Sequence, residues 1–201
     1  MRKKYRLTPW KYHNELLRYA LLPVVRLYFA WHGIPWQPGW RIFGLPLIQK
    51  HGGSHISIGS YLQMRNWFSS NPIGVNHRTI LATWSEGAAI RLGNHIRLSG
   101  ATICAVTSIS IGNYVTIGAN STILDSDSHP LAISDRLIDP RAGKSEAIVI
   151  EDGVFIGMQA LILKGSHVGE GSVIGAGSVV AGEVPPGVIV AGNPATIIRE
   201  L

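Results

Sequence analysis

Aliphatic residues recur at every sixth position through the second half of the chain. The unbroken run is Ile150, Ile156, Ile162, Val168, Ile174 and Val180, and the same spacing passes through Ile111, Ile117, Ile123 and, less regularly, Leu92 and Leu98. A period this short is typical of a parallel β-helix, in which three short strands make one triangular coil with its aliphatic side chains pointing inward. The pattern therefore predicts an all-β prism over residues 56–200.

Small residues and glycines fall between the aliphatic positions. A narrow prism has little interior volume, and the small residues two places before the next aliphatic residue suit it: Ser121, Ala160, Ser166, Ser172 and Ser178. Glycine and asparagine tolerate the positive φ angles of tight corners. We therefore expect corners at Gly112, Gly118, Gly157, Gly169, Gly175, Asn113 and Asn120.

The N-terminal segment follows a helical spacing instead. Thr8 followed by Pro9 is typical of a helix start, and the apolar stripe consists of Leu17, Ala20, Leu21, Val24, Leu27, Tyr28 and Trp31. Pro23 is expected to divide the segment into two helices, with the second ended by Gly33 and Pro35. Residues 1–55 are thus predicted to form a basic, aromatic helical extension.

Two interruptions break the six-residue rhythm. Between residues 56 and 92 the spacing is irregular, which fits either an imperfect coil or a loop. The second interruption is a predicted projecting loop over residues 125–149, and a long insertion in a regular solenoid usually serves function. This loop begins with three ionisable side chains, Asp125, Asp127 and His129.

These three side chains allow two interpretations. A His beside two carboxylates can act as a general base near neutral pH, because the acids fix its tautomer and stabilise its protonated form. Alternatively, Asp125 and Asp127 cap the turn while His129 is a solvated surface residue, since Asp, Ser and Pro are common in turns. The residues alone leave both interpretations open.

Composition limits the class of protein. The chain has 201 residues, of which 46% are hydrophobic, a mean hydropathy of +0.19 and no apolar run near the ~20 residues of a membrane span. The basic start MRKKYR is followed by a segment too polar for a signal peptide, so we expect a cytoplasmic protein. The single cysteine, Cys104, lies in an apolar strand and is expected to be a core residue rather than a nucleophile.

Charge is concentrated at the N-terminal end. Residues 1–85 hold eleven of the 18 Lys and Arg, a single acid, Glu15, and all six Trp, which gives this part a net charge of +10. Basic residues interleaved with aromatic ones suit an anionic interface, either the inner membrane leaflet or lipid-linked glycans, contacted through residues 1–40. The alternative is that the apolar stripe covers the open end of the prism or packs against a neighbouring subunit. No nucleic-acid partner is expected, because no nucleic-acid motif accompanies the charges.

Three stretches of the chain resemble a known enzyme family. They are SGATIC, SISIGNYVTIGANSTILDSDSHP and the run from IVIEDGVFIGMQALILKGSHVGEG to the last residue. They are similar to the hexapeptide-repeat acetyltransferases of the left-handed β-helix class, in particular the maltose, galactoside and nodulation-type O-acetyltransferases and their relatives in bacterial polysaccharide gene clusters. The resemblance spans about residues 90–201. It implies left-handed coils, a handedness that the spacing itself does not reveal.

The resemblance also implies an activity, transfer of an acetyl group from acetyl-CoA to a hydroxyl of a sugar. The family's catalytic base is the His of the motif ending in HP, which is His129 here. Asp127 or Asp125 would orient it, and a backbone N–H near Gly157 or Met158 would stabilise the developing oxyanion. Family members are homotrimers with CoA grooves between adjacent prisms, so one subunit would supply His129 and its neighbour much of the cofactor site.

Further site residues follow from the resemblance. Acetyl-CoA is expected to contact Gly157, Met158, Ala176, Lys164 and Arg199, and the acceptor is expected to contact Phe155 and Arg136. Four positions depart from the family pattern: Phe155 replaces a common Trp, Gly100 an acceptor-binding Asn, Gly182 a Lys and Thr196 an Arg. The CoA phosphates are therefore expected to meet Arg199, Lys164 or the basic N-terminal region.

Other functions of the same fold predict different residues. A γ-type carbonic anhydrase needs three His ligands for zinc on neighbouring coils, whereas His95, His129 and His167 are widely separated in the sequence, so no metal is expected. A noncatalytic scaffold has no need for a loop with a His and two acids. An N-acyltransferase acting on a nucleotide-linked amino sugar uses the same prism and a base, and it is the main alternative.

Overall fold

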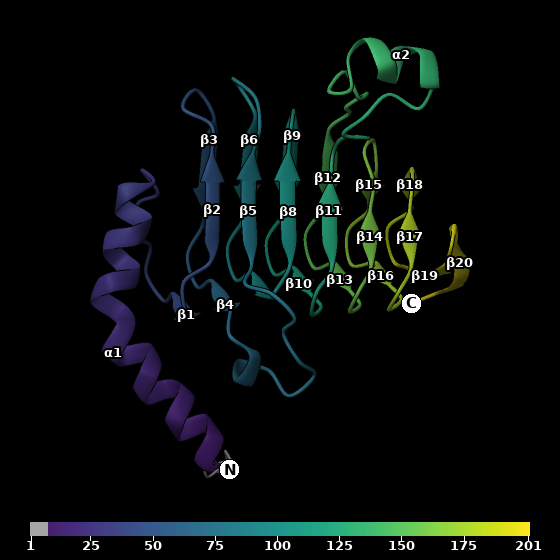
Figure 1. Cartoon of the computed structure of the whole chain (residues 1–201). Helices are drawn as coiled ribbons and strands as arrows, with labels where there is room; N and C mark the ends of the chain where they lie inside the picture. The colour runs from purple at the N-terminus through teal and green to yellow at the C-terminus, as the bar shows by residue number, and fades with distance from the viewer. Residues whose placement is uncertain (1–7) are drawn as a thin grey trace.

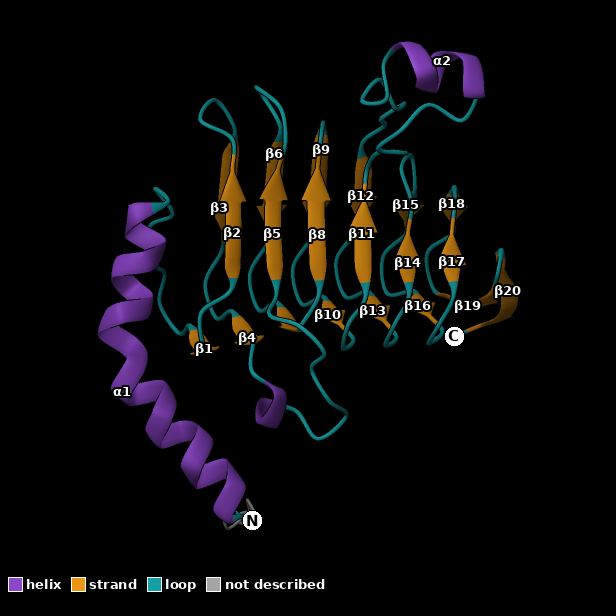
Figure 2. Ribbon diagram, viewed as in Figure 1, coloured by secondary structure: helices purple, strands orange, loops and turns teal. Residues whose placement is uncertain are grey.

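The computed structural model describes residues 8–201, which form a prism of short parallel strands with one long helix at its N-terminal end (Figure 1). Successive strands enter three different sheets, and each strand up to β16 pairs in parallel with the strand three places further along the chain. Three strands therefore make one coil, and the coils form the expected left-handed parallel β-helix (Figure 2).

The three sheets run the length of the prism. The first sheet contains β1 (Arg41–Phe43), β4 (Gln63–Arg65), β7 (Arg97–Ser99), β10 (Thr116–Ile117), β13 (Phe155–Ile156), β16 (Val173–Ile174), β19 (Val188–Gly192) and β20 (Ala195–Glu200). The second contains β2 (Leu47–Lys50), β5 (Ile80–Thr83), β8 (Thr102–Ala105), β11 (Thr122–Leu124), β14 (Leu161–Ile162) and β17 (Val179–Val180). The third contains β3 (His55–Ile58), β6 (Ala89–Leu92), β9 (Ser108–Ile111), β12 (Ile148–Ile150), β15 (His167–Val168) and β18 (Glu183–Val184).

The aliphatic positions of the repeat line the interior of the prism, as predicted. Ile156 pairs with Ile174 in the first sheet, and Ile162 pairs with Val180 in the second. The six aliphatic side chains of the run that ends at Val180 are at most 2% exposed, and burying a side chain of this size contributes about 2 kcal/mol. The predicted small residues are also buried: Ser121, Ala160, Ser166, Ser172 and Ser178.

The repeat glycines have a different role from the predicted one. A Cβ on Gly118 would lie 2.4 Å from the backbone nitrogen of Met158, and a Cβ on Gly157 would lie 2.5 Å from that of Ala176. These glycines are needed because consecutive coils approach closely, and neither has a positive φ. The positive φ angles fall two residues later, and Asn120 is the one predicted corner residue that has such an angle.

The first coil begins earlier than the sequence suggested. Strand β1 pairs in parallel with β4, with Arg41 opposite Gln63. The prism therefore starts at Arg41, inside the predicted extension of residues 1–55. Between β4 and β5 the chain leaves the prism in a loop that contains a short 3-10 helix, η1 (Phe68–Ser70). This loop accounts for the irregular spacing over residues 56–92.

One continuous helix, α1 (Pro9–Trp31), lies across the N-terminal end of the prism. Pro9 occupies its first turn as predicted, but Pro23 lies inside the helix and does not divide it. An internal proline removes one helical hydrogen bond, and contacts on both sides of Pro23 hold the helix in place. Asn14 donates a hydrogen bond to the carbonyl of Ser69 at 2.9 Å, and Phe29 is fully buried.

The outer face of α1 is apolar. The buried side chains of the helix are Asn14, Arg18, Val25 and Phe29, so Val25 and Phe29 cover the end of the prism. Of the predicted apolar stripe, only Leu17 and Tyr28 are partly buried. The large apolar side chains left exposed on the helix are Trp10, Tyr12, Leu16, Tyr19, Leu21, Val24, Leu27 and Trp31. Within residues 8–201, no helix is long and apolar enough to cross a membrane.

The predicted loop projects from the edge between the second and third sheets (Figure 1). It leaves β11 after Leu124, contains the short helix α2 (Ile133–Ile138) and rejoins the prism at β12. The two ends of the loop meet in an isolated bridge between Ser126 and Ser145. The loop therefore stands on a narrow base above an uninterrupted prism.

Candidate active site

His129 lies near the base of the projecting loop, with its side chain exposed. Its ring Nδ1 is within hydrogen-bonding distance of the carbonyl oxygen of Pro140, in the returning part of the loop. A carbonyl oxygen only accepts hydrogen bonds, so Nδ1 carries the proton of the neutral imidazole. The Nε2 atom then has a free lone pair and can accept a proton, as a general base must.

Asp125 is fully buried and is bound to the preceding coil rather than to His129. Its carboxylate accepts hydrogen bonds from the backbone N–H groups of Val106 at 2.7 Å and Thr107 at 2.8 Å, and from the Thr107 hydroxyl at 2.8 Å. These bonds satisfy backbone donors at the corner from which the loop departs. Asp125 therefore fixes the base of the loop, and the prediction that it orients His129 is wrong.

Asp127 also has another partner. Its carboxylate lies 3.1 Å from the ammonium of Lys164, and its backbone N–H donates to the carbonyl of Lys144 at 2.9 Å. The ion pair ties the loop to the prism beneath a cavity of about 690 Å³ between α2 and the coils. The orienting partner of His129 is thus the Pro140 carbonyl, in place of either predicted carboxylate.

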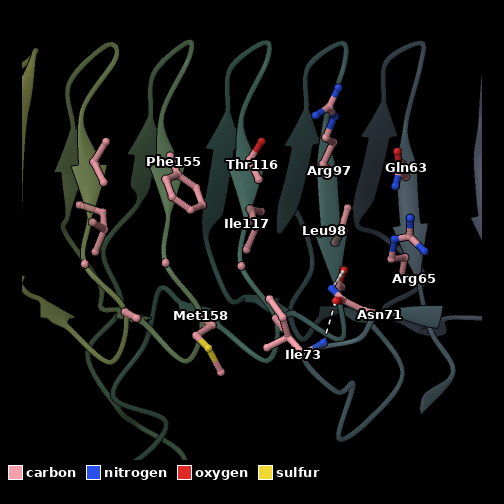
Figure 3. Close-up of a pocket in the computed structure, with 18 residues that line it drawn as sticks. Gln63, Arg65, Asn71, Ile73, Arg97, Leu98, Thr116, Ile117, Phe155 and Met158 are labelled. Atoms are coloured by element: carbon pink, nitrogen blue, oxygen red, sulfur yellow. Dashed lines mark hydrogen bonds between the residues drawn. The ribbon is translucent and has the colours of Figure 1, made fainter. Parts of the chain in front are cut away.

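A groove of about 420 Å³ runs along the first sheet and the corner that follows it (Figure 3). Four of the predicted binding residues line it together: Phe155, Gly157, Met158 and Ala176. The Phe155 side chain is 47% exposed and forms an aromatic wall of the groove. The loop around η1 closes the opposite end, where Asn71 donates a hydrogen bond to the hydroxyl of Ser99 at 3.1 Å. We call this space the main groove.

Of the two backbone donors predicted for the oxyanion, Gly157 and Met158, one is free in the main groove. The Gly157 N–H is already bonded to the carbonyl of Ile174 at 2.7 Å, within the strand ladder. At another corner of the prism, the backbone N–H of Asn113 donates to the carboxylate of Asp152 on the next coil at 2.7 Å. Ala176 stands to Met158 as Asp152 stands to Asn113, one coil further on. Because alanine has no side-chain acceptor, it cannot bind the Met158 N–H in the same way. Among the described residues the Met158 N–H has no hydrogen-bond partner, so it is the available one of the two predicted donors.

The histidines that a zinc site would need are far apart. The His95 ring is stacked between Tyr61 and Tyr114, and His167 lies between Glu151 and Glu183 on the third sheet. Over the described range, no group of three or more His, Cys, Asp or Glu side chains is placed to hold a metal ion. Cys104 is buried, and burial raises the pKa of its thiol to about 11, which agrees with a core role.

Comparison with known proteins supports the interpretation of the prism. A family model described as "Bacterial transferase hexapeptide (six repeats)" matches residues 147–182. The galactoside O-acetyltransferase of Lactococcus lactis subsp. lactis is 37% identical over 95 residues, which are 47% of this chain and 44% of the relative. The chain spans about half the length of the curated relatives it matches.

Solved structures extend the comparison. A hexapeptide-repeat acetyltransferase from Vibrio cholerae O1 biovar eltor, complexed with acetyl coenzyme A, is 33% identical with a TM-score of 0.54, over 62% of this chain and 69% of that one. The chain belongs to the hexapeptide-repeat acetyltransferase family. A mutant of AntD, an N-acyltransferase from Bacillus cereus in complex with dTDP-4-amino-4,6-dideoxyglucose and coenzyme A, shares the fold at 17% identity, with a TM-score of 0.66 over 87% of this chain and 88% of that one.

Three of the predicted site residues lie outside the main groove. The Arg136 guanidinium donates to the carbonyls of Pro130 and Leu131 at 2.8 and 3.1 Å, so it organises the loop and does not face the groove where an acceptor was expected. Lys164 is held by Asp127, as described above. Arg199 lies on β20 opposite Ile189, beyond the C-terminal end of the groove, and its side chain is exposed.

Sequence reasoning missed the polar side chains at the other end of the main groove. Gln63, Arg97 and Thr116 occupy successive strands of the first sheet and line the groove before Phe155 (Figure 3). Each stands directly before an inward aliphatic residue, so their outward orientation follows from the repeat. The sequence does not predict that these three residues share one sheet, because loops of unequal length separate their coils. Arg65 lies beside them, and burial lowers the pKa of its guanidinium, with Arg41 adding repulsion.

Proposed function

We propose that this chain transfers an acetyl group from acetyl-CoA to a hydroxyl of a sugar, with His129 as the general base. The observation that carries the proposal is the Pro140 carbonyl at Nδ1 of His129, which leaves Nε2 free on an exposed ring. The family membership of the chain supports the donor. The relatives described above are named as an O-acetyltransferase and as an acetyltransferase complexed with acetyl coenzyme A.

The proposed reaction needs three contributions from the protein. His129 Nε2 takes the proton of the acceptor hydroxyl while that oxygen attacks the thioester carbonyl. The Met158 N–H stabilises the oxyanion that forms, because a preorganised donor there needs no rearrangement. As the C–S bond breaks, the protonated His129 returns its proton to the leaving thiolate, so the products are free CoA and the acetylated sugar. The apolar wall of Phe155 excludes water from the thioester.

We expect the working enzyme to be a homotrimer. His129 projects from the edge between the second and third sheets, whereas Phe155 and Met158 belong to the main groove along the first sheet. A second subunit is therefore needed to bring a His129 to each groove. Light scattering at micromolar concentration should give three times the chain mass. Coexpression of His129→Ala with Ala176→Trp should restore activity that each variant lacks alone, because mixed trimers contain intact composite sites.

An N-acyltransferase acting on an amino sugar is the second candidate function. A curated N-acetyltransferase of Clostridium perfringens that is 57% identical over 53 residues, 26% of this chain, supports it. The two candidates differ in the acceptor. An amine acceptor is protonated near neutral pH, so its acetylation should increase as the pH approaches the pKa of the amine, whereas a hydroxyl acceptor should depend on the state of the base alone.

The N-terminal end supports a further part of the proposal, a role in polysaccharide biosynthesis at the inner membrane face. The exposed apolar face of α1 includes Leu16, Leu27 and Trp31, and the only acid among residues 1–85 is paired with Arg18 and Arg41. Apolar and aromatic side chains beside excess positive charge suit peripheral binding to anionic lipids. The proposed enzyme is cytoplasmic, with its acceptor a lipid-linked or polymeric saccharide.

The test of the acetyl transfer is thiol release from acetyl-CoA with a panel of sugars and oligosaccharides. Loss of a general base should reduce acceptor-dependent release by about 10²-fold or more in His129→Ala. His55→Ala removes another exposed His, on β3, and serves as the matched control with unchanged rate. Equal rates in wild type and His129→Ala would contradict the assignment of the base. If wild type released no thiol, calorimetry with acetyl-CoA would test the donor directly.

A further inference from the structure

Three aromatic rings form a column along the edge between the third and first sheets. His95 stacks between Tyr61 and Tyr114 with centroid distances of 4.5 and 4.6 Å and interplanar angles of 4° and 6°. We call these residues the ring column. All three have positive φ angles of 58° to 62°. Such angles strain residues that carry a Cβ, and the corresponding positions of later coils are glycines, beginning with Gly153 at φ 70°. Three large rings thus occupy corner positions at which only glycine would be free of backbone strain.

The ring column ends in an open slot. One face of the Tyr114 ring covers His95. On the next coil the equivalent position is Gly153: the Tyr114 N–H donates to the carbonyl of Asn94, and the Gly153 N–H donates in the same way to that of Asn113. A Cβ on Gly153 would meet no atom closer than 3.7 Å. Tyr114 is 64% exposed. Its second ring face therefore looks onto space that no side chain of the next coil fills.

The ring column and the main groove form one continuous surface. A side cavity of about 420 Å³ lies between the rings and the outward side chains of the first sheet, and its lining includes Gln63, Arg97 and Thr116. The same three side chains line the main groove. Figure 3 shows them on successive strands that lead to Phe155. The open slot beside Tyr114 belongs to the same coil as Phe155, so a molecule in the slot lies at the entrance of the main groove.

This surface is positively charged. No Asp or Glu lines either the side cavity or the main groove, whereas Arg97 lines both. The Arg97 side chain is exposed and makes no hydrogen bond or ion pair with any residue in the described part of the chain. A guanidinium presents paired N–H donors that match a carboxylate or a phosphate. Gln63 and Thr116 beside it offer an amide and a hydroxyl, which can bind sugar hydroxyls.

We propose that the ring column and Arg97 bind the acceptor as an anionic saccharide. The C–H face of one sugar ring covers the free face of Tyr114 above Gly153, and Arg97 binds the carboxylate or phosphate that the saccharide carries. Gln63 and Thr116 bind hydroxyls between these points. The role of this saccharide as acceptor rests on the proposed acetyl transfer. The binding of an anionic saccharide can be measured without any transfer.

Calorimetry of the full chain tests the binding with three probes: tetragalacturonic acid, galactose 1-phosphate and neutral maltotetraose. At least one anionic probe should bind about tenfold or more tightly than maltotetraose, and Arg97→Gln should abolish that advantage while Arg97→Lys keeps part of it. The two anionic probes distinguish a carboxylate from a phosphate as the recognised group. Equal affinity for all three probes, or no binding of any, would overturn the proposal.

A glycine pair tests the slot beside Tyr114. Gly153→Asn places a side chain in the slot, and Gly171→Asn places the same side chain one coil further on, at a nearly equal φ of 69°. Asn tolerates this conformation. Gly153→Asn should weaken binding of the anionic probe about tenfold, and Gly171→Asn should leave it unchanged. Equal effects of the two substitutions would show that the slot is not used.

Kinetics then separate this inference from the proposed function. In thiol-release assays, Arg97→Gln should raise the KM for an anionic acceptor and leave the KM for acetyl-CoA unchanged. A raised KM for acetyl-CoA with an unchanged acceptor KM would assign Arg97 to the donor and refute the inference, while leaving acetyl transfer intact. Binding of the anionic probe without thiol release in any assay would instead uphold the saccharide site and refute the proposed reaction.

Discussion

His129 is bound through Nδ1 to the carbonyl oxygen of Pro140, eleven residues further along the same loop. The contact is between a side chain and the backbone, so the orientation of the imidazole depends on the path of the returning loop and on no second side chain. Gly143 lies on that path, and a Cβ added there would lie 2.6 Å from the backbone nitrogen of His129. The position of His129, the proposed base, is therefore sensitive to Gly143, a residue that carries no functional group.

Gly143→Ala should lower kcat for acetyl transfer about tenfold or more, because a displacement near 1 Å at a reacting group costs up to 10²-fold. The KM for acetyl-CoA and the melting temperature should change little, since the loop stands outside the prism core. Gly52→Ala is the matched control, because a Cβ there meets nothing within 4 Å. An unchanged kcat in Gly143→Ala would show that the position of His129 does not depend on the path of the returning loop.

Asp125→Ala should destabilise the fold by about 2–4 kcal/mol, because it leaves the N–H groups of Val106 and Thr107 without their acceptor. Denaturant unfolding monitored by circular dichroism measures this change. Asp135→Ala, on the exposed helix α2, should shift the unfolding free energy by about 0.5 kcal/mol or less. Similar values for both variants would mean that the buried carboxylate does not hold the corner.

Stability should depend on pH through His167. Its hydrogen bond to Glu151 at 2.8 Å, and the charges of Glu183 and Glu151, raise the pKa of His167 above its ordinary value of 6.5. A raised pKa contributes stability that is fully present below the unfolded pKa and is lost as pH rises through the folded pKa. The hydrogen bond to His167 also lowers the pKa of Glu151, and that contribution is lost at acid pH.

The measurable consequence concerns His167→Gln. The difference in unfolding free energy between wild type and this variant should be largest near about pH 6 and should shrink toward about pH 9, where His167 is neutral in both states. Chemical denaturation across this range gives the difference directly. A difference that stayed constant with pH would mean that the Glu151–His167 pair is not formed in solution. Both side chains are exposed by about two fifths, so the effect should also weaken in high salt.

Replacing Leu16 and Leu27 together by Glu should abolish flotation of the full chain with anionic vesicles. Both side chains are 70% exposed on α1, so the substitution should leave the melting temperature nearly unchanged while it places charge on the proposed membrane face. Leu131→Glu with Leu137→Glu is a matched control on the projecting loop, where both leucines are also exposed. Equal flotation of the two double variants, or no flotation of wild type, would exclude α1 as the membrane contact.

The regular part of the fold could be predicted from sequence because one constraint repeats there. From Ile111 onward each coil must bury one aliphatic residue per sheet, and only the projecting loop interrupts the six-residue spacing of these residues. The first coil at Arg41 could not be predicted in the same way, since loops of unequal length hide its spacing. Pro23 was misinterpreted because its local cost is outweighed by tertiary contacts such as the burial of Phe29.

The face of α1 was also misjudged for a physical reason. An apolar helical stripe usually faces the core, but here Val25 and Phe29 suffice to cover the end of the prism, together with the polar Asn14 and Arg18. In the candidate site, Phe155, which the resemblance assigned to the acceptor, lines one groove with Gly157, Met158 and Ala176, which it assigned to acetyl-CoA; their roles stay predictions. The partner of His129 is a backbone carbonyl, and no side-chain pattern in a sequence reports which carbonyl a ring will meet.

The close stacking of coils at Gly118 limits where this molecule can acquire new chemistry. Adjacent coils leave no room for even one methyl group there, so additions inside the prism are excluded and additions at its edges are free. The loop bearing His129 shows this freedom, because β12 resumes pairing with β9 in register, Ile148 opposite Ile109, as though the insertion were absent. The prism is thus a rigid support, and the loop that carries His129, the proposed base, is an insertion at its edge that the coils do not depend on. Shortening or grafting that loop should alter what the protein does without altering whether it folds.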